Sequence, residues 1–134
     1  MSIETLNDDS LGKIRFDKVN SLLILEWTEA TKGMIDPHFQ GILYILAGYA
    51  LQKKAKRIFV DTRKFMFQPG EGLVGSWRTK NISPLYNEAG VEKFAFLFPP
   101  DAPIPPTSGQ NMAEENFPTG FFISEKDLMS WLLT

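Results

Sequence analysis

Residues 57–67 read RIFVDTRKFMF, an apolar run that stops at Asp61 and restarts as Phe65-Met66-Phe67. Its first part, Ile58-Phe59-Val60, is short and continuously apolar, which is typical of a parallel strand that is buried on both faces. Such a strand lies near the centre of its sheet. The question is whether the acid at its end, Asp61, is a functional group or a cap for the loop that follows.

The sequence before this strand predicts a hairpin and a long helix. Residues 11–16 and 22–28 are two apolar runs separated by the polar stretch 17–21, which favours two strands joined by a short turn. Asp36-Pro37 then supplies an N-cap and a proline at the first helical position of a helix that extends to about residue 54. Gly41 and Gly48 each cost this helix up to about 1 kcal/mol, which a close approach to the sheet would offset.

The sequence after the strand predicts further alternation of helices and strands. Residues 71–81 read as a helix that Pro84 does not continue, residues 85–88 form a separate short turn closed by Gly90, and residues 91–98 form a strand. The segment 99–110 has too many prolines for a strand or a helix. A last strand at 121–123 precedes a helix that Ser124 caps, with Trp131 buried on its apolar face.

This order predicts an α/β fold. We expect a mixed, mostly parallel sheet of about five strands, opened by an N-terminal β-hairpin, with helices packed on it. At 134 residues the chain is expected to form a single domain over 1–134, with residues 1–10 as a loose N-terminal tail.

Composition excludes several kinds of function. The net charge of −2 and the absence of basic residues interleaved with exposed aromatics argue against nucleic-acid binding. No apolar run approaches the roughly 18 residues that a membrane span needs, and no leader is recognisable, so we expect a cytoplasmic protein without membrane insertion. With no Cys and one His, His38, no metal site and no cofactor are expected.

The element order, the strand RIFVDTRKF, the strand GVEKFAFLFP and the closing FPTGFFISEKDLMSWL resemble the small stand-alone bacterial STAS and anti-sigma-factor-antagonist-like (SpoIIAA-like) proteins. The resemblance covers most of the chain from Leu11 onward and implies a fold, with no catalytic residue. The stand-alone relatives are also similar to lipid-transfer domains of the CRAL-TRIO type, which implies a pocket between helices and sheet. In the phospho-switched antagonists a Ser opens the helix after the strand that here ends at Asp61. Here that place reads QPGEGLVGS, and Ser76 is expected a turn or more inside the helix, which argues against such a switch.

The candidate ligand-binding residues follow from the expected sheet. Ligands of open α/β sheets collect beyond the carboxyl ends of the strands, where Asp61, Thr62 and Arg63 stand. Asp61 lacks a second carboxylate, so we expect it to accept loop N–H bonds or to pair with Arg63 or Lys64. Trp77 and Arg78 form a second candidate surface, with Arg78 available to an anion. The literal GxGxxG at residues 70–75 does not follow its strand directly, so nucleotide binding is not expected.

Phe65, Met66 and Phe67 are three consecutive large apolar residues in a loop, and they cannot all face inward. Together with Ile104 in the proline-rich segment, they predict a homodimer interface or the mouth of a pocket for an apolar ligand.

These observations favour a non-enzymatic STAS-like binding or regulatory domain with no catalytic residue. It would act through association with a partner protein, with its own copy, or with a small apolar or anionic ligand. The alternative is a small hydrolase or transferase that uses Asp61 with Arg63 or Arg78. A deep pocket that contains Asp61 would favour this alternative, whereas a flat patch rich in Phe would favour association.

Overall fold

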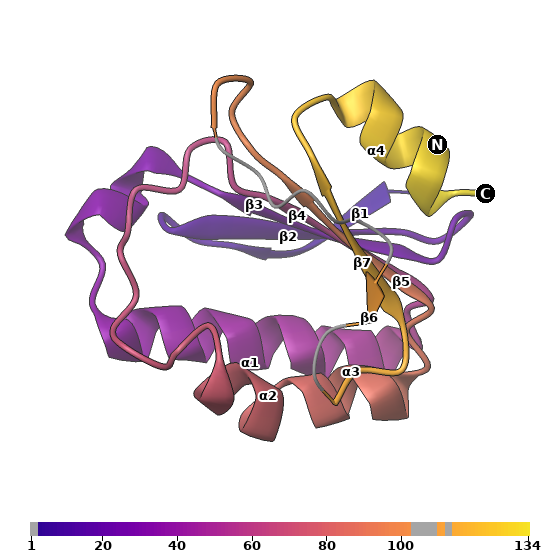
Figure 1. Cartoon of the computed structure of the whole chain (residues 1–134), viewed down its shortest axis with the longest axis horizontal. Helices are drawn as coiled ribbons and strands as arrows, with labels where there is room; N and C mark the ends of the chain where they lie inside the picture. Colours follow the sequence, from indigo (N-terminus) through magenta and orange to yellow (C-terminus); the bar gives the residue numbers. More distant parts are fainter. Residues whose placement is uncertain (1–2, 103–109, 112–113) are drawn as a thin grey trace.

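The computed structural model of the chain describes residues 3–102, 110–111 and 114–134. Its centre is a seven-stranded mixed sheet with the strand order β1-β2-β3-β4-β5-β7-β6 (Figure 1). The strands are β1 (Ile3–Asp8), β2 (Gly12–Asp17), β3 (Leu22–Trp27), β4 (Arg57–Asp61), β5 (Lys93–Leu97), β6 (Gln110–Asn111) and β7 (Pro118–Phe122). The predicted α/β class and the opening hairpin, β2 and β3, are confirmed.

Two kinds of pairing make up this sheet. Strand β2 is antiparallel to both of its neighbours, β1 and β3, whereas β3, β4, β5 and β7 run parallel to one another. The short strand β6 is antiparallel to β7 and ends the sheet. The strand that the sequence placed at the centre, β4, is the middle strand of the seven.

Helices cover both faces of the sheet (Figure 1). Helices α1, α2 and α3 lie along one face, and α4 lies on the other. Their bounds are α1 (Asp36–Lys53), α2 (Ser76–Asn81), α3 (Ser83–Ala89) and α4 (Glu125–Leu132), and a 3-10 helix at Glu29–Gly33 precedes α1.

The central strand β4 explains why two layers of helices are needed. Ile58 and Val60 point into the larger core with α1, while Phe59 belongs to the smaller core under α4. Because successive side chains of a strand alternate between faces, Asp61 lies on the same face as Phe59. The last residue of β4 is therefore directed to the α4 side of the sheet.

The N-terminal segment is a strand, and the prediction of a loose tail over residues 1–10 was wrong for Ile3–Asp8. This segment pairs with β2, and Lys53 of α1 forms an ion pair with Glu4 at 3.0 Å. The hydroxyl of Tyr49 also donates a hydrogen bond to the carbonyl of Leu6 at 2.9 Å. Strands β1 and β6 at the two edges account for the difference between the expected five strands and the observed seven.

Helix α1 begins one residue earlier than expected. Its N-cap is Ile35, without a side-chain cap, and Asp36 is already helical. The Asp36 carboxylate instead accepts a hydrogen bond from the backbone N–H of Gly70 at 3.0 Å. Asp36 thus anchors the loop that follows β4 to the start of α1.

The explanation offered for Gly41 and Gly48 was wrong. A Cβ atom at either position would meet nothing within 4 Å, so neither glycine allows a close contact with the sheet. Both residues carry the cost of a helical glycine without a packing reason.

The C-terminal helix follows the prediction at its start and departs from it at its end. The Ser124 side chain accepts the backbone N–H of Asp127 at 3.3 Å, as expected for a cap. Leu128 and Leu132 are fully buried, but Trp131 is only half-buried, packed on Phe122 with its ring 5.6 Å away. Trp131 covers the border of the smaller core.

Candidate functional site

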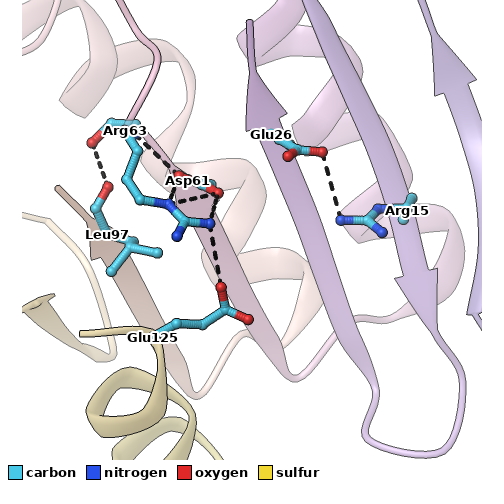
Figure 2. Close-up of polar contacts among 7 residues, drawn as sticks. Arg15, Glu26, Asp61, Arg63, Leu97 and Glu125 are labelled. Carbon is cyan, nitrogen blue, oxygen red and sulfur yellow. Dashed lines mark hydrogen bonds and ion pairs between the residues drawn. The ribbon is translucent and has the colours of Figure 1, made fainter. Parts of the chain in front are cut away.

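Asp61 is a cap for its own loop. Its Oδ1 accepts the backbone N–H of Arg63 at 3.0 Å and the Nε–H of the same arginine at 3.0 Å. Nη2 of Arg63 lies 2.7 Å from Oδ2, so the pair is bidentate (Figure 2). Asp61 is 7% exposed, and the pairing raises the pKa of Arg63. The expectation that Asp61 caps the loop and pairs with Arg63 is confirmed.

The Asp61–Arg63 pair also ties the loop to α4. Nη2 of Arg63 lies 3.3 Å from Oε1 of Glu125, in the first turn of that helix (Figure 2). A second ion pair on the same side, between Arg15 and Glu26, spans β2 and β3 at 3.7 Å. These contacts join neighbouring elements, and none of these residues lines the pocket described next.

A pocket of about 570 Å³ lies on the other side of the sheet, between its strands and helices α1 to α3. Its floor includes Trp27 at the end of β3, Thr62 after β4 and Phe98 after β5. These positions are the carboxyl ends of adjacent parallel strands, where ligands of α/β sheets collect. Val74 and Gln68, both exposed, stand at the rim, so the pocket opens at the loop between β4 and α2. Its volume falls within the range of small-molecule sites.

The pocket wall on the β5 and β7 side is aromatic. Phe96 and Phe121 stack with their rings 5.8 Å apart and only 8° from parallel. Phe98 continues this arrangement beside Phe121, at 6.2 Å and 25°. Side chains at alternate positions of β5 and at matching positions of β7 point to one face, so the register of the two strands builds this wall.

Arg78 of α2 is the only charged residue among the described residues that line the pocket. Its Nη1 lies 2.6 Å from Oε2 of Glu115, and the hydroxyl of Ser83 donates to the same oxygen at 2.6 Å. The guanidinium lies over the rings of Tyr86 and Phe94, with its carbon 5.7 and 5.3 Å from the ring centres. Arg78 is therefore held by a buried carboxylate and two rings of the pocket.

Tyr86 is fully buried beside this arginine. Burial raises the pKa of the Tyr86 phenol well above its ordinary value, the charge of Arg78 lowers it, and Glu115 adds to the rise. The phenol is therefore neutral throughout the physiological range.

The structure divides the predicted ligand-binding residues between the two faces of the sheet. Thr62 and Arg78 line the pocket, whereas Asp61 and Arg63 form the capping pair on the α4 side. Trp77 packs edge-on against Tyr44 of α1, with ring centres 5.6 Å apart, and does not line the pocket. The five residues do not form one site, and Asp61 and Arg78 do not meet.

The apolar run after β4 turns partly inward. Phe65 and Phe67 line the pocket and pack on Phe39, while Met66 is 54% exposed. This arrangement agrees with the expectation that the three side chains cannot all face inward. Ile104 lies outside the described residues.

The position expected for Ser76 was wrong, because α2 begins at this residue and residues 71–75 form turns instead of a helix. Gly72 has a φ of +84°, which favours glycine and keeps this segment from becoming helical. The argument against a phospho-switch that relied on Ser76 lying inside the helix therefore does not hold. Of the glycines of the GxGxxG pattern, Gly72 and Gly75 belong to this turn segment and Gly70 directly precedes it.

Sequence analysis did not identify Glu115 or Ser83. Glu115 is 37 residues from Arg78 and follows the proline-rich segment, so no local pattern links the two. The sequence around Glu115 offered only two adjacent acids followed by an asparagine, a polar stretch that is common in loops.

Among the described residues, no group of three or more His, Asp or Glu side chains is placed to hold a metal ion. Within the same part of the chain, no helix has the length and apolar character needed to cross a membrane. A comparison with protein-family models, one with curated proteins and one with solved structures each found no match for this chain.

Proposed function

We propose that the protein is a non-enzymatic binding domain that holds a small apolar ligand in the pocket between the sheet and helices α1 to α3. The observation that carries this proposal is the pocket itself, which is lined mainly by aromatic and aliphatic side chains and lies at the carboxyl ends of the parallel strands. A few polar groups at its wall, Thr62, Gln68 and Arg78, would orient the ligand.

The resemblance to the STAS and SpoIIAA-like proteins remains part of this proposal. A sheet opened by a hairpin and continued by parallel strands, with helices on both faces, supports it at the level of fold. We propose a regulatory role in a bacterial cytoplasm on the basis of that resemblance. The fold by itself does not specify this role.

The enzymatic alternative has less support. Asp61 forms an ion pair with Arg63 and lies on the opposite face of the sheet from Arg78. Asp61 and Arg78 therefore do not form a common site. The pair Asp61–Arg63 stands outside the pocket, with Glu125 as its neighbour. We therefore propose that the chain binds its ligand without transforming it.

The test is a titration with the uncharged hydrocarbon 2-ethylnaphthalene, followed by NMR of the methyl groups. Signals from Leu46 and Val60, which line the pocket, should shift with a dissociation constant in the micromolar range, roughly −8 kcal/mol of binding free energy. Signals from Leu128 and Leu132, in the core under α4, should not shift.

A matched pair of variants shows where the hydrocarbon binds. Phe98 and Phe122 are both half-buried, one at the pocket and the other against Trp131 on the opposite face. Phe98→Ala should weaken binding about tenfold, because it removes part of the aromatic wall. Phe122→Ala should leave the dissociation constant within about twofold. Equal effects of the two variants, or no shift in the wild type, would refute the proposal.

A further inference from the structure

Nη2 of Arg78 is a buried donor atom without a hydrogen-bond partner among the described residues. Nη1 of the same guanidinium is bonded to Glu115, and both rings that flank the guanidinium, Tyr86 and Phe94, also line the pocket. The guanidinium is therefore set among the residues of the pocket wall, but Nη2 itself is covered. A ligand in the pocket reaches this donor only by a shift of the Arg78 side chain, which is 13% exposed. Buried donors are nearly always paired, so one without a partner calls for an acceptor that the described part of the chain does not supply.

The charge around Arg78 decides which kind of acceptor fits. Glu115 forms an ion pair with Arg78 at 2.6 Å, and the side chain of Glu115 has no exposed surface. The pair as a whole is thus electrically neutral. An anionic ligand group would place an additional, uncompensated negative charge beside the buried carboxylate, which is costly in an apolar environment. A neutral oxygen acceptor satisfies the donor without adding charge.

The aromatic wall of the pocket indicates the shape of the apolar part of the ligand. The rings of Phe96 and Phe121 are within 8° of parallel, and Phe98 lies beside them at 25° to Phe121. Half-buried rings stacked in this way form an ordered aromatic row at the pocket wall, and a flat aromatic body can extend the row with edge-to-face or offset contacts.

We propose that the pocket takes a flat, uncharged aromatic compound whose carbonyl oxygen accepts a hydrogen bond from Nη2 of Arg78. This inference rests on the proposed function and names the chemical class of its ligand. It departs from the sequence-based expectation of an anion at Arg78, because Glu115 already neutralises that arginine.

Three probes that share the naphthalene ring and are similar in size separate the alternatives. Methyl 2-naphthoate is neutral and carries a carbonyl, 2-ethylnaphthalene has no acceptor, and 2-naphthoate is anionic. In the wild type, methyl 2-naphthoate should bind about tenfold more tightly than 2-ethylnaphthalene, the effect of one hydrogen bond to a charged donor. It should also bind about tenfold more tightly than 2-naphthoate. Dissociation constants come from methyl-group NMR titrations.

Two variants assign these preferences to the Arg78–Glu115 pair. Glu115→Gln removes the compensating charge and leaves Arg78 in place, so the order should reverse and 2-naphthoate should bind about tenfold more tightly than the ester. Arg78→Met should abolish the preference of the ester over the hydrocarbon. Arg63→Met is the control, because Arg63 is also ion-paired but lies on the opposite face, and all three affinities should stay within twofold.

Each result has a distinct meaning. If the hydrocarbon binds in the pocket but the ester gains nothing over it, Arg78 is not the anchor and this inference fails while the proposed function stands. If 2-naphthoate is already the tightest probe in the wild type, the ligand is anionic and the inference is overturned. If none of the three binds, the proposed function fails as well. Should Arg78→Met not fold, the reversal in Glu115→Gln still decides the matter.

Discussion

Asp61 shows how one carboxylate can hold a loop without taking part in chemistry. It accepts the backbone and side-chain N–H groups of Arg63 and is nearly buried. Asp61→Ala should lower the free energy of unfolding by about 1–3 kcal/mol, the scale of hydrogen bonds to a charged group, as measured by urea denaturation. Affinity for 2-ethylnaphthalene should change less than twofold. A loss of binding without a loss of stability would make Asp61 a ligand residue.

Tyr86 gives a pH dependence whose sign follows from its burial. Its pKa is raised in the folded protein, so between the ordinary value of 10.0 and the folded value the native state binds more protons than the unfolded state. Stability is therefore complete below pH 10 and falls as the pH rises further, by at most about 1.4 kcal/mol per pH unit. Tyr86→Phe should remove this part of the slope in denaturation curves taken from pH 9 to 11. Identical slopes in the two proteins would contradict the assignment.

At the scale of elements, helix α1 carries two glycines that its packing does not need. A Cβ atom at Gly48 would meet nothing within 4 Å, and the residue is exposed. Gly48→Ala should therefore stabilise the protein by about 0.5–1 kcal/mol through helix propensity alone. The midpoint of urea denaturation should rise at an unchanged slope. A decrease would mean that the glycine serves a contact, for example with a second molecule.

Helix α4 is held mainly by its leucines. Leu128 is fully buried in the smaller core, so Leu128→Ala should cost about 2–5 kcal/mol. Trp131 is half-buried, and Trp131→Ala should cost less than Leu128→Ala, although a fully buried tryptophan would lose about 3–5 kcal/mol. Denaturant midpoints of the two variants rank them. The reverse order would show that Trp131 supports the helix more than its burial indicates.

The elements that could be predicted are those whose signal is local. The apolar run Ile58-Phe59-Val60 identified the central strand, because a strand buried on both faces is continuously apolar. Ser124 identified the start of α4, because a helix cap depends on residues close in the sequence. Strand β1 was missed because its outer positions are exposed and carry no apolar alternation. The start of α2 was missed because the positive φ of Gly72 is a property of the folded turn.

At the scale of the molecule, the candidate site was predictable only in its location. The carboxyl ends of the strands pointed to the neighbourhood of Thr62, which does line the pocket. The sequence did not indicate which face of the sheet carries the pocket, because Asp61 and Thr62 are adjacent and point to different faces. The pairing of Arg78 with Glu115 depends on a contact across 37 residues, and such contacts leave no local pattern.

Homodimer formation, the remaining prediction, now depends on fewer residues than the sequence indicated. Phe65 and Phe67 face the pocket, so only Met66 of the three is more than half exposed, with Val74 at 64% exposure at the pocket rim. Phe67→Asp would therefore disturb the pocket and is a poor test.

Met66→Asp is the appropriate test, because it places a charge on the exposed surface and leaves the pocket lining unchanged. If two copies associate through this surface, a two-fold dimer would bury Met66 from both, and the charge should separate them without unfolding. We expect light scattering to give a dimer mass for the wild type at high micromolar concentration and a monomer mass for Met66→Asp, with the same melting curve for the dilute proteins. A wild type that is monomeric at that concentration would contradict the dimer. Met66 would then be an exposed apolar side chain in the loop after β4 that takes no part in association.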